Sequence, residues 1–338
     1  MKQRIKYIDH LKGISILLVV IGHIIQYNVA DSKDNGLFNF IYSFHMPLFM
    51  FISGYVSVLT IKINIFPTYF DFLLKKMRTL LLPFFTWALL VDSVFFNNPL
   101  KFDFYGRFAE LFYDPRTGLW FLWYLFFLTV LYSAFLFISS RWNLKSSFLI
   151  DVLIFTALLA LLVLLRVLKI TIYVDSFIQY YLYFFIGVFV AKYLWLKQLI
   201  LNVRYFSFFL ISFLILVGHF SFNDPGLHSL GTALLLKISV AISGIFVLYY
   251  IVYNAVWTSI LDDFITHWGM SSLAIYATHF KFLEVLKGFP LMPSLSMTLL
   301  IPISLMVSII IIVICMKIYE IVKLSPVLNL LLYGAKIK

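Results

Sequence analysis

The amino-acid sequence predicts an all-α, polytopic integral membrane protein with about ten transmembrane helices, and two observations support this prediction. First, 63% of the 338 residues are hydrophobic and only 12% are charged, whereas about a quarter of the residues in soluble globular domains are charged. Second, apolar stretches of about 20 residues recur along the chain, and each is long enough to cross a bilayer as a helix. The polar interruption at 97–118 is too short for a soluble domain, so residues 1–338 are expected to form a single transmembrane domain.

The apolar stretches place the spanning helices near residues 13–30, 38–60, 79–96, 119–138, 148–168, 176–195, 205–222, 230–252, 270–288 and 296–316. If the N-terminus is cytoplasmic, the inner loops hold about twice as many lysines and arginines as the outer loops, which favours an N-in, C-in topology. In a soluble protein the net charge of +11 would suggest nucleic acid, but here it must first be discounted for membrane topology, so no nucleic-acid partner is predicted. We expect the first stretch to be a retained helix, because Asp9, Lys12 and His23 interrupt it and no small-residue cleavage site follows.

The first helix carries ionisable residues at membrane depth, which are costly there and indicate a functional site. Lys12 and His23 are eleven positions apart, so on an α-helix they point in directions only about 20° apart and lie roughly 16 Å apart along the axis. Asp9 is close enough in rotation to pair with Lys12. This layout suits a donor with an anionic head near Lys12 and a reactive end near His23. The structural alternative is that Lys12 reaches the interface while His23 donates a hydrogen bond to a neighbouring helix carbonyl.

Two further histidines in the predicted spans are candidates for the site. His45 precedes Pro47 near the outer end of the second span, where it could be a second catalytic or acceptor-binding group or could equally cap a helix interface. His279 lies in the ninth span, in the segment SSLAIYATHF, and is expected to support the site.

A basic cluster of Lys75, Lys76 and Arg78 precedes the third span on the predicted cytoplasmic side. Positive-inside topology explains most clusters of this kind. The functional alternative is recognition of phosphates, to which arginine and lysine are both suited.

Several kinds of site are not predicted. The single cysteine, Cys315, excludes an intramolecular disulfide and a cysteine-based metal site. The sequence has no metalloprotease motif, phosphate-binding Walker loop or dinucleotide fingerprint. No metal site and no tightly bound cofactor are therefore expected.

The segments IDHLKGISILLVVIGHIIQ and FIYSFHMPLFMFISGYV resemble the opening of the acyltransferase-3 family of bacterial membrane acyltransferases. That family has a basic residue, ten intervening positions and then histidine in its first helix, and Lys12 and His23 fit the spacing, with lysine where many members carry arginine. The segment KKMRTLLLPFF is similar to the family's arginine-rich motif ending in proline: Lys75 and Lys76 replace arginines, while Arg78 and Pro83 match. The resemblance runs from about residue 4 to 316 and is strongest to the short, membrane-only sugar O-acetyltransferases.

The resemblance implies a multi-pass enzyme of the bacterial plasma (inner) membrane. It would move an acyl group, usually acetyl from the cosubstrate acetyl-CoA, to a hydroxyl of a cell-surface polysaccharide or of a lipid-linked sugar. The partners implied are acetyl-CoA, the glycan or lipid-linked sugar acceptor and membrane lipids. CoA phosphates would lie near Lys12 and the 75–78 cluster, and His23 would act as a base or carry the acyl group transiently.

Two alternatives remain at this point. A transporter or flippase of a lipid-linked saccharide would also need intramembrane charges, although no repeated, broken helices typical of transporters are visible. An enzyme of the other large membrane O-acyltransferase family is disfavoured, because the first two helices fit the acyltransferase-3 pattern better.

Overall fold

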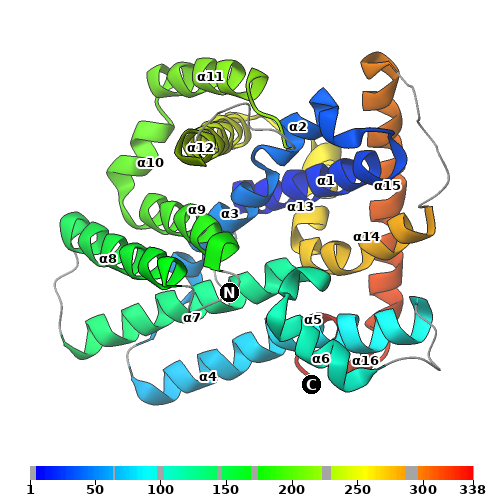
Figure 1. The fold of residues 1–338 in the computed structure, drawn as a ribbon, viewed down its shortest axis with the longest axis horizontal. Helices are drawn as coiled ribbons and strands as arrows, with labels where there is room; N and C mark the ends of the chain where they lie inside the picture. The colour runs from blue at the N-terminus through cyan, green and yellow to red at the C-terminus, as the bar shows by residue number, and fades with distance from the viewer. Residues whose placement is uncertain are drawn as a thin grey trace. The chain divides into compact units, whose positions relative to one another are not determined.

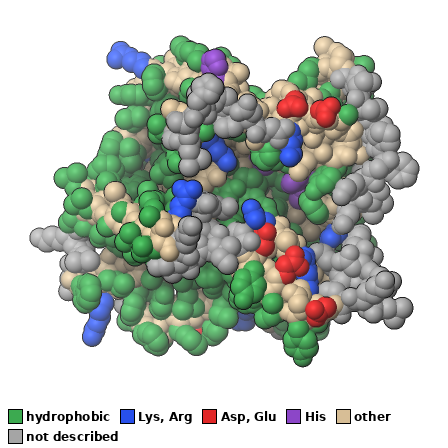
Figure 2. All heavy atoms as spheres, viewed as in Figure 1, with side chains coloured by type: hydrophobic (Ala, Val, Ile, Leu, Met, Phe, Trp, Pro, Cys, Tyr) green, Lys and Arg blue, Asp and Glu red, His purple; other side chains and the backbone are tan. Residues whose placement is uncertain are grey.

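The computed structural model describes residues 5–63, 65–96, 103–142, 147–168, 174–222, 230–286 and 296–337. Within these ranges the chain forms helices joined by turns and loops, with no β-strand (Figure 1). Apolar side chains are widespread on the face shown in Figure 2, as expected for a surface that contacts lipid. The prediction of an all-α, polytopic membrane protein is confirmed.

Six helical segments in the described ranges are long and apolar enough to cross a membrane, or up to seven if a bent pair counts as one span. The six are Lys6–Asn28, Gly36–Thr60, Trp120–Arg141, Phe148–Val167, Thr232–Asn254 and Met297–Val322. The other four predicted spans also lie in helical segments. The total of ten and the N-in, C-in orientation remain predictions. Residues 287–288 of the ninth predicted span and 97–102 of the long polar interruption lie outside the described residues.

The first of two compact units comprises Met1–Ile52 and Leu194–Tyr319. Its helices are α1 (Lys6–Asn28), α2 (Gly36–Tyr42), the first half of α3 (His45–Thr60), α10 (Leu194–Ile200), α11 (Val203–Gly218), α12 (Leu230–Asn254), α13 (Ser259–Met270), α14 (Ser272–Leu286) and most of α15 (Met297–Val322). α1 packs against α2, α12, α13 and α14, and 72% of its most apolar stretch is buried. α1 is therefore the core helix of this unit.

α1 and α13 approach each other closely at two glycines. A Cβ atom on Gly13 would lie 2.2 Å from the carbonyl oxygen of Ile265, and one on Gly269 would lie 1.9 Å from that of Asp9. Small residues at such positions allow the backbones of membrane helices to touch. The two glycines therefore fix how α13 lies along the N-terminal half of α1.

α1 begins at Lys6, whereas the apolar stretch predicted a span from residue 13. The earlier start has a local cause in the contacts of Asp262 on α13. Its carboxylate accepts hydrogen bonds from Lys6 at 2.9 Å and from His10 at 2.6 Å. Because these polar side chains are paired by another helix, the helix extends through residues that hydropathy alone leaves outside.

The second predicted span, 38–60, is interrupted at Ser43 and Phe44, between α2 and α3. Asn35 caps α2, since its side-chain oxygen accepts hydrogen bonds from the backbone N–H groups of Leu37 and Phe38. Pro47 in the first turn of α3 has no N–H to donate to the carbonyl of Ser43, which favours a break there. The chain therefore turns between α2 and α3, and the end of α2 lies close to the start of α3.

The second unit comprises Ser53–Tyr193 and Glu320–Lys338. It contains the rest of α3, α4 (Phe66–Lys76), α5 (Leu82–Thr86), α6 (Phe104–Tyr113), α7 (Trp120–Arg141), α8 (Phe148–Val167), α9 (Val174–Lys192) and α16 (Pro326–Tyr333). π-helical turns flank α5, at Met77–Leu81 and Trp87–Phe96. Pro83 accounts for part of this irregularity, because a proline within a helix removes a backbone hydrogen bond.

α16 packs against α5 within this unit. The indole N–H of Trp87 donates a hydrogen bond of 3.0 Å to the carbonyl of Leu332. Gly334 follows with φ of +67°, and a Cβ atom there would lie 2.4 Å from the carbonyl oxygen of Arg78. Glycine is suited to this backbone conformation, so it ends α16 directly against the segment that carries Arg78.

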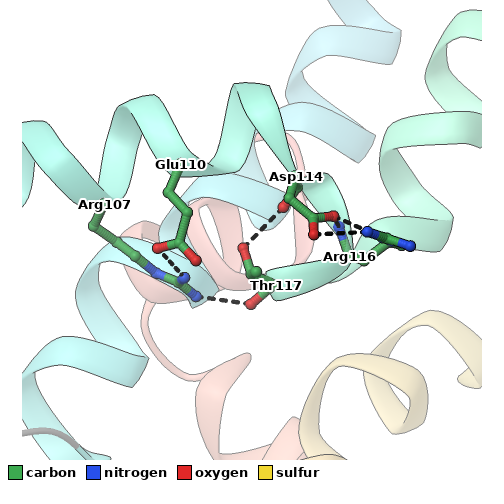
Figure 3. A network of polar contacts seen from close by, with 5 residues as sticks. All are labelled: Arg107, Glu110, Asp114, Arg116 and Thr117. Atoms are coloured by element: carbon green, nitrogen blue, oxygen red, sulfur yellow. Dashed lines mark hydrogen bonds and ion pairs between the residues drawn. The ribbon is translucent and has the colours of Figure 1, made fainter. Parts of the chain in front are cut away.

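The segment between α6 and α7 is held by a network of polar contacts (Figure 3). Arg107 donates to the carboxylate of Glu110 at 2.8 Å and to the carbonyl of Thr117 at 2.7 Å. Arg116 forms a two-point ion pair with Asp114, at 2.8 and 3.0 Å. Exposed ion pairs of this kind stabilise a protein little, so we assign the network a role in shaping the loop that leads into α7.

Candidate active site

Three histidines predicted from the sequence meet in the first unit. The ring centroids of His23 on α1 and His279 on α14 are 5.4 Å apart. Tyr42, at the end of α2, lies against both His23 and His45, with centroid distances of 6.2 and 4.6 Å. The structure therefore brings His279 and Tyr42 against His23, and His45 against Tyr42, although four different helices supply these four residues.

Burial differs within this cluster, which we call the histidine cluster (His23, His45, His279 and Tyr42). His45 and His279 are buried, with 3% and 1% of their surfaces exposed, while His23 is partly exposed. The ring of Tyr27 stacks on His23, and Phe280 contacts it edge to face. Of the three imidazoles, that of His23 is thus the one a ligand can reach most easily.

The hydrogen bonds of the two buried histidines determine which ring nitrogen carries the proton. Nδ1 of His45 lies 2.8 Å from the carbonyl oxygen of Ile41, and Nδ1 of His279 lies 2.9 Å from that of Ile275. A carbonyl oxygen can only accept, so Nδ1–H donates in both cases and Nε2 carries the lone pair. Nε2 of His279 is buried and has no hydrogen-bond partner among the described residues.

His23 has a different partner. Its Nδ1 lies 2.9 Å from Oε1 of Gln26 and 3.2 Å from the hydroxyl oxygen of Tyr42. The Tyr42 hydroxyl donates to the same Gln26 oxygen at 2.6 Å. The structural alternative considered for His23, a hydrogen bond to a neighbouring helix carbonyl, is therefore not the contact that this nitrogen makes.

Gln26 and Tyr42 were missed in the sequence. Gln26 could have been found, because residues three positions apart on a helix are neighbours. Tyr42 comes from another helix, and its approach to His23 depends on the break between α2 and α3. Nothing in the spacing of the sequence indicates that contact.

The N-terminal half of α1 carries two other predicted residues, Asp9 and Lys12. Nζ of Lys12 lies 3.8 Å from a carboxylate oxygen of Asp9, so the predicted pairing is present. Since α1 is continuous from Lys6 to Asn28, Lys12 and His23 share one helix as expected. On α13, the hydrogen bond from Lys6, followed in importance by that from His10, lowers the pKa of Asp262.

The basic cluster lies in the second unit, at the end of α4 and in the turn that follows. Lys75 is exposed, while Lys76 and Arg78 are partly buried. The Lys76 ammonium lies 5.5 Å from the centre of the Phe72 ring. Burial, together with the neighbouring charge of Lys75, lowers the pKa of Lys76 to about 8. Lys76 therefore loses part of its positive charge within a pH range in which an enzyme assay can be run.

The histidine cluster has the means for proton transfer. A neutral imidazole that keeps its Nε2 lone pair can accept a proton from a hydroxyl, and histidine is the side chain most often used for this purpose. Among the described residues no group of three or more His, Cys, Asp and Glu is arranged to hold a metal ion. Fold and site thus define a polytopic membrane protein with a partly buried cluster suited to acid–base chemistry.

Similarity to known proteins identifies the family. The family model described as "Acyltransferase domain" (the acyltransferase-3 family) matches residues 5–317. The chain therefore belongs to this family of acyltransferases, as its first two helices predicted. Membership of an enzyme family disfavours the transporter alternative.

Two curated relatives share part of the chain. Nodulation protein NolL of Sinorhizobium fredii is 37% identical over 149 residues, which are 41% of this chain and 39% of that protein. Nodulation protein NolL of Mesorhizobium japonicum is 36% identical over 123 residues, 34% of this chain and 31% of that protein. The chain thus matches less than half the length of each relative. No solved structure matches the chain.

Proposed function

We propose that this acyltransferase moves an acetyl group from acetyl-CoA to a hydroxyl of a cell-surface polysaccharide or lipid-linked sugar. We place it in the bacterial plasma membrane, as one transmembrane catalytic domain over residues 1–338. The observation that carries the proposal is the histidine cluster, in which the partly exposed imidazole of His23 lies beside the buried His279 and shares the neighbour Tyr42 with the buried His45. Family membership supplies the reaction class.

His23 is the proposed base. A sugar hydroxyl is a weak nucleophile near neutral pH, and a positioned base is needed to activate it. As Nε2 of His23 takes the hydroxyl proton, the sugar oxygen bonds to the thioester carbonyl carbon. The carbon–sulfur bond then breaks, and the thiolate of CoA leaves with the proton returned from His23. In a two-step route His23 would carry the acetyl group first, which would produce ping-pong kinetics.

The other cluster members have supporting parts. His45 keeps its Nε2 lone pair and is proposed as a second catalytic or acceptor-binding group. His279 is proposed to support His23, whose ring lies beside it. Both are buried, so they would act on groups that enter the site and not on bulk water.

The donor is proposed to bind through its phosphates. Lys12 offers a positive charge on the same helix as His23, and Asp9 holds that charge in place at 3.8 Å. Lys75, Lys76 and Arg78 belong to the other unit and are proposed separately as phosphate-binding residues, as the family resemblance implies; an arginine can hold a phosphate with two parallel hydrogen bonds. Acetyl-CoA is thus treated as a cosubstrate.

The test is transfer of radiolabelled acetyl from acetyl-CoA to a panel of glycan acceptors by the purified protein in lipid nanodiscs. His23→Ala should lower the transfer rate at least about a hundredfold, the lower range for loss of a general base. His219→Ala is the matched control, because His219 is exposed at the end of α11. Undiminished transfer by His23→Ala would overturn the assignment of the base. Failure of the wild type to bind acetyl-CoA under any condition would overturn the proposed reaction.

A further inference from the structure

The side chain of Gln26 is positioned to control the imidazole of His23. Oε1 of Gln26 lies 2.9 Å from Nδ1 of His23 and 2.6 Å from the hydroxyl oxygen of Tyr42. The three side chains therefore form a closed triangle, whose third side is the 3.2 Å contact between Tyr42 and His23. Residues of two helices, α1 and α2, thus meet at one amide oxygen.

The distances determine which atom donates in each contact. A separation of 2.6 Å is typical of O–H···O hydrogen bonds and shorter than most N–H···O bonds, so the Tyr42 hydroxyl donates to the Gln26 oxygen. A phenol has one hydrogen to donate, and this contact uses it. Nδ1 of His23 then faces only acceptors, the Gln26 oxygen and the lone pairs of the Tyr42 oxygen. Nδ1 must carry the hydrogen, and Nε2 is left with the lone pair.

We propose that Gln26 is a positioning residue for the acyl transfer: held by Tyr42, it fixes the His23 tautomer that exposes a basic Nε2. The inference rests on the proposed function, because it assigns Gln26 and Tyr42 their roles through His23. A base with two interchangeable nitrogens spends part of its time with a proton on the nitrogen that faces the substrate. A fixed acceptor at Nδ1 removes that unproductive form.

Among the described residues, four helices supply the groups near the His23 ring. Gln26 and Tyr27 come from α1, Tyr42 from α2, and His279 and Phe280 from α14. His45 of α3 is close enough to interact with His23 electrostatically. None of these is a carboxylate. Gln26→Glu would therefore introduce a carboxylate that still accepts from Nδ1–H and, when ionised, also favours the charged imidazolium.

Two variants of Gln26 test the role kinetically in the acetyl-transfer assay. Gln26→Leu should lower kcat about tenfold or more with KM for acetyl-CoA little changed, because it affects only the proton-transfer step. Gln26→Glu should retain substantial activity and move the acid limb of the pH–rate profile upward by about one unit. A purely structural role would predict equal loss in both variants and no shift of the profile. That result would overturn the proposal.

Tyr42→Phe tests the anchor of the amide and should lower kcat several-fold. Tyr205→Phe is its matched control, since Tyr205 lies exposed on α11 and its replacement should leave the rate unchanged. Equal rates for wild type and Tyr42→Phe would remove Tyr42 from the proposal. Thermal unfolding of every variant in nanodiscs separates a change in rate from loss of fold.

A spectroscopic measurement tests the tautomer without reference to activity. Protein labelled with ¹⁵N-histidine is compared with His23→Asn, so that the signals of His23 appear in the difference. The expected result is a protonated Nδ1 and an unprotonated Nε2 in the wild type, and loss of that preference in Gln26→Leu. A protonated Nε2 in the wild type would overturn the inference. If the expected tautomer is found but His23→Ala still transfers acetyl, the proposed function fails while the geometry stands.

Discussion

His23 and His279 face each other with ring centroids 5.4 Å apart and ring planes inclined by 34°. His23 belongs to α1, and His279 belongs to α14 near the other end of the chain. Their neutral forms both leave Nε2 without the proton, because Nδ1 of His23 faces Gln26 and Tyr42 and Nδ1 of His279 faces the carbonyl of Ile275. With His45, the cluster thus offers three basic nitrogens, of which the one on His23 is the most accessible.

Replacement of His279 by leucine should lower kcat for acetyl transfer about tenfold, because the second acceptor nitrogen is lost from the cluster. Unfolding temperature should change little, since the Nδ1–H bond is made within α14 and leucine fills much of the same apolar space. His219→Leu, on the exposed end of α11, is the control. An unchanged kcat would show that His279 contributes to packing and not to acetyl transfer.

Lys12 is expected to act on donor binding and not on the chemical step. Lys12→Ala should raise KM for acetyl-CoA about tenfold, within the energy of a charge-assisted contact, and Lys12→Arg should preserve or lower it because guanidinium binds phosphate well. Lys33→Ala, in a loop on the predicted outer side, should leave KM unchanged. A rise in KM for Lys33→Ala as large as that for Lys12→Ala would contradict the predicted side of donor entry.

The pH dependence of donor binding should reveal Lys76. Its pKa is lowered to about 8 by burial and by the charge of Lys75, so its positive charge is complete below that pH and is lost as pH rises through it. KM for acetyl-CoA should therefore increase between about pH 7 and 9. Lys76→Arg keeps its charge throughout and should flatten the curve. The same increase in both proteins would exclude Lys76 as its source.

The contact between α1 and α13 should be sensitive to a single methyl group. A Cβ atom on Gly269 would lie 1.9 Å from the carbonyl oxygen of Asp9, so Gly269→Ala should destabilise the protein by about 1–3 kcal/mol, as overpacking does. Gly218 has no atom within 4 Å of the equivalent position, and Gly218→Ala should be tolerated. Thermal unfolding in nanodiscs measures both. Equal unfolding temperatures for the two variants would show that the helices can separate at no cost.

The fold class and the arrangement of Asp9, Lys12 and His23 along α1 could be predicted from the sequence for a physical reason. Hydropathy reports transfer from water to lipid, and helical phase follows from a fixed rotation per residue. Both are local properties. The Lys12–Asp9 contact and the continuity between Lys12 and His23 are local as well, and the structure has both.

The composition of the histidine cluster required tertiary information. His279 and His45 were predicted to matter as costly residues in apolar runs, but their approach to His23 depends on how α14 and α3 pack. The start of α1 at Lys6, before the apolar stretch predicted from residue 13, depends on Asp262 of α13, which pairs with Lys6 and His10. The break between α2 and α3 was missed because the hydropathy of 38–60 is continuous across it.

The burial of α1 has a consequence for how the protein is made. His10 and Asp262 are separated by 252 positions, so at about 5–20 residues per second the ribosome adds α13 on the order of ten to fifty seconds after α1. During that interval α1 is in the membrane with Asp9, His10 and Lys12 but without the helix that pairs and covers them. α1 is thus incompletely packed until the later helices have been synthesised. A chain that terminates before α13 should therefore be degraded.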